Sequence, residues 1–300
     1  MSSLEQVARS LIRIELEDWA VLHALERLIP SYESIPIDQI VKMSNLSKEE
    51  VEFRMNKLNE MGFVIRDARG YSLISSGLDA IALNALVKRD LISAIGKPIG
   101  MGKESDVIEA INNFGEKYAI KFYRIGRISF RAVRKKRRYT TTLSGHRWLI
   151  VNMQAAKKEY NALKKLYSIG VSVPEAIARE RHAVLMRKID GLMLSDIKIL
   201  DSPVKVLREI IDNVKLAYTV GGIVNSDLNE YNILYNGNKA WIIDWPQYVD
   251  KNHPNSSMLL DRDLSNILRF FKKRFKVDCK LELTSFYVRG WSDKLEIFQL

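Results

Sequence analysis

Residues 225–247 read NSDLNEYNILYNGNKAWIIDWPQ, and this stretch decides the fold. It begins with an aspartate, Asp227, and an asparagine five residues later, Asn232. Two short apolar runs then predict a strand pair, at 233–235 and 240–243. The second strand ends at Asp244. Because Mg²⁺ is a hard ion that prefers oxygen ligands, Asn232 and Asp244 are candidate metal ligands, and Asp227 is a candidate to orient or deprotonate an attacking oxygen.

The same spacing occurs in the D-x-x-x-x-N catalytic loop of protein kinases, which predicts a phosphate-binding loop upstream. The segment IGMGKESDV ends at Val107 and aligns with the kinase pattern G-x-G-x-x-G-x-V, with Ser105 in place of the third glycine. Glycines let backbone amides approach phosphate oxygens closely, although a simple hairpin turn gives the same composition. The spacing excludes a Walker A loop. The candidate nucleotide contacts here are Gly100, Gly102, Lys103, Glu104, Ser105 and Val107.

A lysine in the run YAIKFY, Lys121, lies on a predicted buried strand. A buried ammonium group is costly unless it is paired. The run resembles the V-A-I-K strand of kinases, whose lysine contacts the α- and β-phosphates and pairs with a helical glutamate. Glu159 is the first acid after Glu116 and is the candidate partner; the alternative is an ordinary surface glutamate.

The first 90 residues predict a winged helix domain. Helical spacing and a hairpin pattern occur in turn, with helices at 3–14, 17–29 and 47–61 and strands at 63–66 and 71–74. Ser47 and Glu50 form a capping-box pattern that would begin the third helix. This helix would be the recognition element, with Lys48, Arg54 and Lys57 facing outward. Acidic residues dilute that face, so protein docking and nucleic-acid binding both stay open.

From about residue 94 the pattern changes to short strands followed by longer helices. The predicted elements are a connecting helix at 76–93, strands at 94–100, 106–112 and 117–123, and helices at 152–168 and 203–220. The chain ends 56 residues after Asp244, which leaves no room for the activation loop and peptide-docking helices of an ordinary protein kinase. We therefore expect a reduced kinase fold.

The charge of the 300-residue chain is uneven. The formal net charge is +11, but residues 1–90 carry 11 basic and 14 acidic side chains. Residues 124–138 carry eight basic side chains and no acid, a density that binds polyphosphate or nucleic acid, although a solvated loop is the alternative.

A single cysteine, Cys279, excludes an intramolecular disulfide framework. No apolar run could span a bilayer and no signal-peptide pattern begins the chain, so we expect a cytoplasmic protein without membrane contact.

Taken together, the chain resembles the RIO family of atypical kinases, in the subfamily that carries an N-terminal winged helix. The specific segments are GMGKESDV at 100–107, GRISFR at 126–131, MRKIDG at 186–191, DLNEYN at 227–232, IIDWPQ at 242–247 and HPNSSMLLDRD at 253–263. The resemblance implies an α+β chain with two parts. A winged helix domain with a connecting helix occupies 1–90, and a reduced bilobal RIO kinase domain occupies 91–300, with its N-lobe at about 91–185 and its C-lobe at about 190–300.

The resemblance also implies roles for these residues. Ser105 and the loop amides would contact the triphosphate of ATP, and Lys121 would bind phosphates and pair with Glu159. Asp227 would be the catalytic-loop aspartate, with Mg²⁺, or Mn²⁺ as an alternative, on Asn232 and Asp244. The adenine hinge would comprise Met186, Lys188 and Ile189, and Ser129 would be an autophosphorylation site. Two departures are Asn225-Ser226, where the family usually has His-Gly, and Trp245, where it often has phenylalanine.

The implied function is ATP-dependent work on the maturing small ribosomal subunit, as a serine autokinase and as an ATPase in which Asp244 accepts the phosphoryl group. The implied partners are the small-subunit precursor and its rRNA, with protein partners through the winged helix. Two rivals stay open. One is a small-molecule phosphotransferase of the aminoglycoside-kinase type, which shares the aspartate–asparagine loop and the Ile-Asp-Trp strand. The other is a DNA-binding regulator with a nucleotide-sensing pseudokinase domain, against which the retained site residues argue.

Overall fold

The computed structural model describes residues 3–126 and 147–299. The chain divides into two compact units. The first unit comprises Met1–Lys157 and Ala178–Leu185, and the second comprises Lys158–Ile177 and Met186–Leu300. Among the described residues, no helix combines the length and the hydrophobicity that a membrane span requires.

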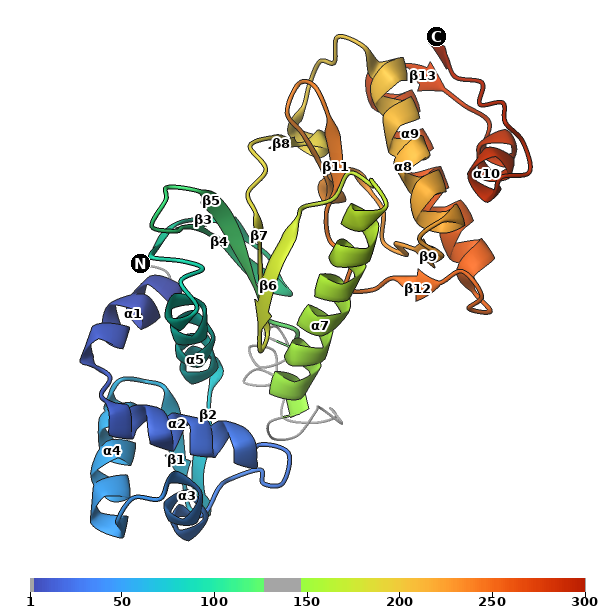
Figure 1. Cartoon of the computed structure of the whole chain (residues 1–300). Helices are drawn as coiled ribbons and strands as arrows, with labels where there is room; N and C mark the ends of the chain where they lie inside the picture. The colour runs from blue at the N-terminus through green and yellow to red at the C-terminus, as the bar shows by residue number, and fades with distance from the viewer. Residues whose placement is uncertain (1–2, 127–146, 300) are drawn as a thin grey trace. The chain divides into compact units, whose positions relative to one another are not determined.

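The first unit begins with the winged helix domain. Its three helices are α2 (Leu16–Leu28), α3 (Ile37–Ser44) and α4 (Lys48–Glu60), followed by the hairpin β1 (Val64–Asp67) and β2 (Gly70–Leu73) (Figure 1). Their shared core contains Val21, Leu22, Leu25, Ile40, Val51, Met55, Leu58, Phe63 and Leu73. The preceding segment forms α1 (Ser3–Ser10) and a 3₁₀ turn (Leu11–Arg13). Helix α1 packs against α5 (Ser75–Lys88), the connecting helix after the wing.

The expected set of three helices is wrong in one member. The sequence pattern predicts helices at 3–14, 17–29 and 47–61, whereas the three helices that precede the hairpin are α2, α3 and α4, and α3 is not predicted. Helix α3 is only eight residues long, it begins after Pro36, and it ends at Asn45 with a left-handed φ of 60°. So short a segment carries too few apolar repeats to be recognised from periodicity.

The hairpin of the wing is extended by the chain that precedes α3. Ile35 and Tyr71 exchange two backbone hydrogen bonds, of 2.7 and 3.0 Å. At the tip, Gly70 has φ of 151°, and a Cβ atom there would lie 2.2 Å from the Ile35 carbonyl oxygen. Only glycine fits this close approach of two backbones. The chain entering α3 is therefore fixed against the wing.

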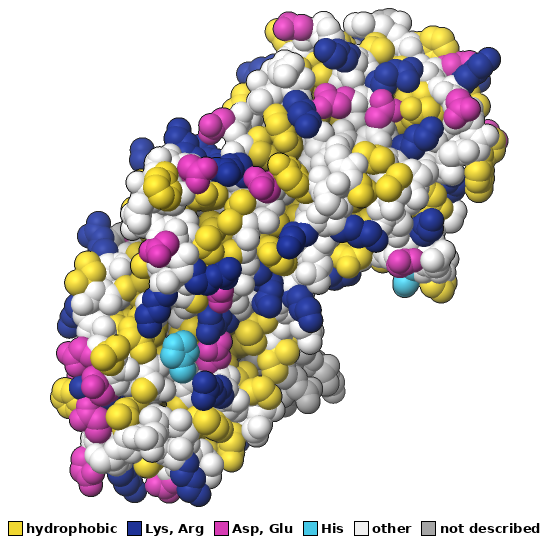
Figure 2. Space-filling view, viewed as in Figure 1, with side chains coloured by type: hydrophobic (Ala, Val, Ile, Leu, Met, Phe, Trp, Pro, Cys, Tyr) yellow, Lys and Arg dark blue, Asp and Glu magenta, His cyan; other side chains and the backbone are white. Residues whose placement is uncertain are grey.

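The recognition helix α4 does not present its basic residues as predicted. Arg54 is buried rather than outward, and it pairs with Glu50 at 2.6 Å and with the acidic start of α2. Lys57 donates to the fully buried Asp18 at 2.6 Å. Only Lys48 is exposed as expected. The spacing of α4 does not reveal that acids from α2 lie opposite it. The exposed positions that remain on α4 are Lys48, Glu49, Glu52, Phe53, Asn56, Asn59 and Glu60, and acidic side chains gather at that edge of the domain (Figure 2).

A five-stranded sheet follows the connecting helix, with strand order β3-β4-β5-β7-β6. The strands are β3 (Ala94–Met101), β4 (Ser105–Ile111), β5 (Lys117–Tyr123), β6 (Ala176–Glu180) and β7 (Ala183–Arg187). The alternation of buried and half-exposed residues along β4 shows that one face of this strand is packed. Helix α7 (Arg147–Ser168) starts in the first unit and ends in the second.

The second unit is built on three helices and several two- or three-stranded ribbons (Figure 1). The helices are α8 (Pro203–Thr219), α9 (Ser256–Phe275) and α10 (Leu281–Arg289), which pack against one another. Strands β10 (Ile233–Tyr235) and β11 (Ala240–Ile242) form the predicted hairpin, joined by β8 (Leu192–Met193). Strand β9 (Ile223–Val224) pairs with β12 (Val249–Asp250), and β13 (Val277–Asp278) pairs with β14 (Phe298–Gln299). Short 3₁₀ turns at Leu194–Asp196 and Glu230–Asn232 complete the unit. The segment 225–232 thus lies between β9 and β10, and Asp244 follows β11.

Candidate active site

In the first unit, the glycine-containing segment forms the turn between β3 and β4. The Gly102 amide donates to the Ser105 carbonyl at 2.8 Å, and a Cβ atom at Gly102 would lie 3.3 Å from that same oxygen. Gly100 stands opposite Val107, where a Cβ atom would meet only ordinary contacts at 3.7 Å. Lys103 is exposed at the tip of the turn. The turn is therefore closed by its own backbone, and no contact with the described residues requires glycine at position 100.

Lys121 lies on β5 directly opposite Val107 of β4, so the sheet register places it beside the glycine turn. Its side chain is 7% exposed, and the ammonium lies 5.2 Å from the centre of the Tyr123 ring. In the second unit, the buried Glu159 accepts a hydrogen bond from the Trp245 amide at 3.2 Å. Lys121 and Glu159 belong to different units, and their predicted ion pair stays a prediction.

The predicted hinge lies at the end of β7. Met186 is buried there, and Lys188 forms an ion pair with Asp190 at 2.6 Å. One boundary between the two units falls between Leu185 and Met186, immediately before the segment that the sequence assigns to the hinge. Its role toward adenine stays a prediction for Met186, Lys188 and Ile189.

The catalytic-loop segment of the second unit is held by a carboxylate from α9. Asp263 accepts from the Ser226 amide at 2.7 Å and from the Leu228 amide at 3.3 Å, which clamps the backbone on both sides of Asp227. The Ser226 hydroxyl also donates to the Gln247 carbonyl at 2.6 Å, and Ser226 has a left-handed φ of 65°. Asp263 lies in the segment HPNSSMLLDRD at 253–263, and the sequence pattern predicts no role for it. The structure shows that it is the anchor of this loop.

Asn225 joins the catalytic loop to the segment after β11. Its amide nitrogen donates to the Asp244 carbonyl at 3.0 Å, and its amide oxygen accepts from the Asp227 amide at 3.1 Å. One side chain therefore contacts the backbones of both candidate carboxylates. Asn225 stands where the family usually has histidine, and it supplies a donor and an acceptor at that point.

Asn232 is tied to both sides of the same loop system. Its side-chain amide donates to the Asp227 carbonyl at 2.9 Å, and its own carbonyl accepts from the Ile243 amide at 2.9 Å. Asp244, the residue after Ile243, has a left-handed φ of 70°, a strained conformation for a non-glycine residue. The structure thus brings Asp227, Asn232 and Asp244 together, as the spacing predicts.

The electrostatics of this site suit a cation. Burial raises the pKa of Asp227 above its ordinary range, and the negative charge of Asp244 raises it further. Two like-charged carboxylates beside an amide oxygen form an all-oxygen donor set of the kind that Mg²⁺ prefers. Within the described ranges, no group of three or more His, Cys, Asp or Glu side chains could hold a metal. The oxygen donors of Asn232 and Asp244 fit Mg²⁺ and would hold it.

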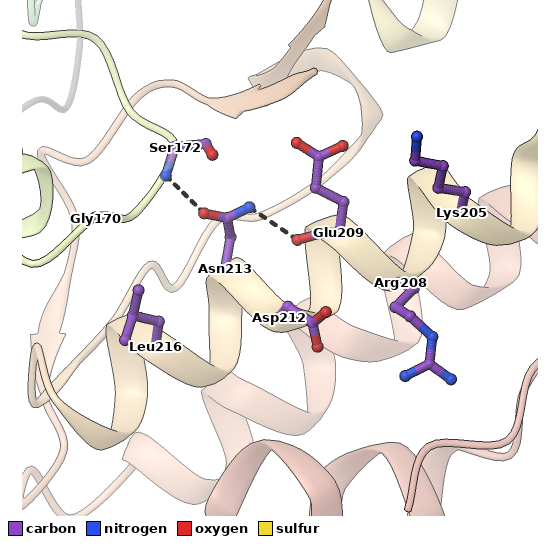
Figure 3. Close-up of a pocket in the computed structure, with 8 residues that line it drawn as sticks. All are labelled: Gly170, Ser172, Lys205, Arg208, Glu209, Asp212, Asn213 and Leu216. Atoms are coloured by element: carbon purple, nitrogen blue, oxygen red, sulfur yellow. Dashed lines mark hydrogen bonds between the residues drawn. The ribbon is translucent and has the colours of Figure 1, made fainter. Parts of the chain in front are cut away.

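A surface pocket lies on α8 (Figure 3). Its volume is about 370 Å³, and its lining includes Ser172, Glu209 and Asn213. Asn213 accepts from the Ser172 amide at 2.6 Å and donates to the Glu209 carbonyl at 2.8 Å, while the Glu209 carboxylate accepts from the Ala240 amide at 3.1 Å. These polar groups bond within the protein and connect α8 to the neighbouring loops. We therefore infer that these residues have a structural role.

Two expectations concern the basic segment 124–138. Arg124 was counted among its eight basic residues, but it is only 4% exposed and pairs with Asp79 and Asp106. It therefore does not belong to a nucleic-acid surface. The other seven basic residues, and the candidate phosphorylation site Ser129, lie outside the described residues.

We expect Asp263 to give the chain a pH-dependent stability in metal-free buffer. Burial raises its pKa to about 7 despite its two amide donors. Between the ordinary pKa of about 3.9 and about 7, the folded chain holds a proton that the unfolded chain lacks. The free energy of unfolding should therefore fall as pH rises through this window, by up to about 1.4 kcal/mol per pH unit.

Denaturant unfolding of the wild type and of Asp263→Asn, from pH 4 to 8, measures this contribution. The difference between the two slopes should be confined to that window, and the exposed control Asp293→Asn should follow the wild type. Parallel curves for the wild type and Asp263→Asn would show that Asp263 is ionised throughout.

Comparison with known proteins places this geometry in a family. A family model described as the RIO domain matches residues 106–284, and one described as Rio2, N-terminal, matches residues 11–89. The RIO-type serine/threonine-protein kinase Rio2 of Methanocaldococcus jannaschii is 38% identical over 253 residues, which cover 82% of this chain and 93% of that protein. The serine/threonine-protein kinase rio2 of Schizosaccharomyces pombe is 33% identical over 269 residues, covering 88% and 78%.

A solved structure agrees with the sequence relatives. The Rio2 kinase–ADP/Mg²⁺–phosphoaspartate complex from Chaetomium thermophilum superimposes with a TM-score of 0.79 and 33% identity, covering 89% of this chain and 83% of that one. The predicted family and fold class, a winged helix domain followed by a RIO domain, are confirmed. The chain belongs to the RIO family of atypical serine/threonine kinases and carries the N-terminal domain of Rio2.

Proposed function

We propose that this chain uses Mg-ATP to phosphorylate serine and to turn over ATP during maturation of the small ribosomal subunit. The observation that carries the proposal is the loop system of the second unit, in which Asn225 and Asp263 hold Asp227 and Asp244 in fixed backbone positions. Phosphoryl transfer depends mainly on positioning and charge stabilisation, and this arrangement supplies both.

In the kinase reaction, Asp227 is the residue next to the attacking hydroxyl. A serine oxygen forms a bond to the γ-phosphorus of ATP while the bond from that phosphorus to the ADP oxygen breaks. The hydroxyl proton passes to the Asp227 carboxylate, whose raised pKa makes it a better proton acceptor than an ordinary aspartate. Bound Mg²⁺ neutralises charge on the phosphates, and Asn232 and Asp244 would hold it.

In the ATPase reaction, Asp244 itself accepts the phosphoryl group. A carboxylate oxygen of Asp244 forms the bond to the γ-phosphorus as ADP leaves, and water then hydrolyses the acyl phosphate to inorganic phosphate. Two observations support this assignment. The left-handed backbone of Asp244 is a strained conformation of the kind found at functional sites. The related complex from Chaetomium thermophilum contains a phosphoaspartate together with ADP and Mg²⁺.

Substitution of the two aspartates separates these roles. After incubation with γ-labelled ATP, the wild type should carry a label that hydroxylamine releases, as expected of an acyl phosphate, and Asp244→Asn should carry none. Asp227→Asn should bind nucleotide normally but phosphorylate serine about 10²–10⁴-fold more slowly, because it lacks the proton acceptor. The exposed Asp250→Asn serves as the control. A hydroxylamine-labile label that persists in Asp244→Asn would assign the phosphoryl acceptor to another carboxylate.

The ribosomal partner is supported by charge. Seven basic residues within 127–138 give the chain a dense cationic segment, and the net charge of +11 favours a polyanionic partner. The winged helix is not the source of this charge, since the basic residues Arg54 and Lys57 of α4 are engaged with acids of the same domain. This observation disfavours a duplex-DNA regulator and leaves α4 to a protein partner.

Gradient co-sedimentation of the full chain with small-subunit precursors tests the partner, with mature subunits and unrelated RNA as controls. We expect selective binding to precursors that survives moderate salt and changes when Mg-ATP is added. Binding to every RNA that disappears with salt would reduce the basic segment to a non-specific contact. Absence of binding, together with ATP turnover stimulated only by a small hydroxyl compound, would favour the aminoglycoside-kinase type instead.

A further inference from the structure

A buried cluster in the first unit contains charged residues to which the proposed function gives no role. Arg124, Asp79, Asp106 and His182 are each at most 4% exposed. Arg124 donates to both oxygens of Asp79, at 2.8 and 2.9 Å, and its Nε donates to Asp106 at 2.9 Å. Nε2 of His182 lies 2.7 Å from Asp79 Oδ1. The guanidinium is therefore fixed by two carboxylates in a geometry that a lysine could not reproduce.

The cluster connects the winged helix to the phosphate-binding turn. Asp79 lies on α5, the helix that follows the wing. Asp106 follows Ser105 at the start of β4, and the Arg124 amide donates to the carbonyl of Glu104 in the turn. Arg124 thus holds the turn through its backbone and holds β4 and α5 through its side chain. It also follows β5, the strand that carries Lys121.

A neighbouring set of ion pairs joins the same domain to the sheet but does not reach the turn. Arg181, between β6 and β7, binds both carboxylate oxygens of Glu26 on α2, at 2.7 and 3.2 Å. Arg89, at the end of α5, binds Glu180 at 2.6 Å. These pairs secure the winged helix against the β6–β7 turn. The Glu26–Arg181 pair is therefore a matched control for the Asp79–Arg124 pair.

Asp79 and Arg124 stabilise each other's charged form, which lowers the pKa of Asp79 and raises that of Arg124. Burial alone would raise the pKa of Asp79, but the Arg124 cation and the hydrogen bond from His182 hold it below its ordinary value. Burial lowers the pKa of His182, which keeps that ring neutral near neutral pH. Buried ion pairs add little net stability compared with apolar packing, so the geometry they impose is the more informative property.

We propose that Asp79 and Arg124 are positioning residues for nucleotide binding, which hold the turn at 102–106 in its binding geometry and couple it to helix α5 of the N-terminal domain. The inference rests on the proposed function, because it assigns the turn to the phosphates. The proposal also means that a change in the contact between Asp79 of α5 and Arg124 changes the affinity for nucleotide. By linkage, bound nucleotide changes the stability of the α5 contact by the same factor.

Calorimetric titration of the full chain with Mg-ADP tests this proposal. Asp79→Asn should raise the dissociation constant about fivefold or more, while Glu26→Gln, which breaks the control pair, should stay within about twofold of the wild type. Asp106→Asn keeps the Asp79–Arg124 pair and should also weaken binding, which covers the case in which Asp79→Asn does not fold. Arg124→Lys keeps the positive charge but cannot bind both carboxylates in the same geometry. It should therefore bind Mg-ADP about as weakly as Asp79→Asn does. Thermal unfolding of each variant reports its stability separately.

The outcomes are distinguishable. If Asp79→Asn and Asp106→Asn unfold at lower temperature but bind Mg-ADP like the wild type, the cluster is only structural and the proposal is overturned. Equal weakening in Glu26→Gln would also overturn it, since any loosening of the domain would then suffice. If the wild type itself binds neither Mg-ADP nor Mg-ATP, the proposed function fails first. In a kinetic assay, a raised KM for ATP with little change in kcat supports the positioning role.

Discussion

The second unit depends on keeping two carboxylates, Asp227 and Asp244, near each other on the same loop system. This arrangement is unfavourable for the bare protein, since each negative charge resists the other and burial adds to the cost. It persists because the backbone is fixed independently of the carboxylates, by Asn225 on one side and Asp263 on the other. A bound cation would relieve this repulsion. We therefore expect the fixed carboxylates to bind Mg²⁺ more tightly than they would on a loop free to move apart. The short hairpin β10–β11 sets the distance along the chain between the two carboxylates.

In the first unit a buried cation, Arg124, holds a loop in place. The turn between β3 and β4 is held by contacts on both of its flanks. Arg124 contributes contacts to Glu104 and Asp106, and it joins them to α5 of the N-terminal domain. In both units a buried polar side chain, fully engaged with its neighbours, fixes a loop whose own residues stay available for a ligand. Helix α5, which follows the wing, is thereby joined to the turn that the proposed function assigns to the nucleotide.

Much of this could be read from the sequence because chemistry and spacing coincide. The strand at 117–123 and the group of Asp227, Asn232 and Asp244 follow from local patterns that tertiary structure does not alter. Helix α3 escapes prediction because it is short, whereas the missed side-chain roles depend on contacts distant in sequence. Arg54 pairs with acids at the start of α2 as well as with Glu50 of its own helix, and the partner acids of Arg124 lie 45 and 18 residues away. The role of Asp263 depends on where α9 passes the catalytic loop.

If Asn232 and Asp244 hold Mg²⁺ beside Asp227, the affinity of the chain for nucleotide depends on the metal. This dependence is measured as the dissociation constant of ATP for the full chain, with saturating Mg²⁺ and with the metal removed by chelation, compared between the wild type and Asp244→Asn. We expect much tighter binding with Mg²⁺ for the wild type. In the variant this difference should largely disappear, while metal-free affinity is kept or improved because one repelling charge is gone. Equal wild-type affinity with and without Mg²⁺, or an undiminished Mg²⁺ effect in the variant, would contradict this expectation.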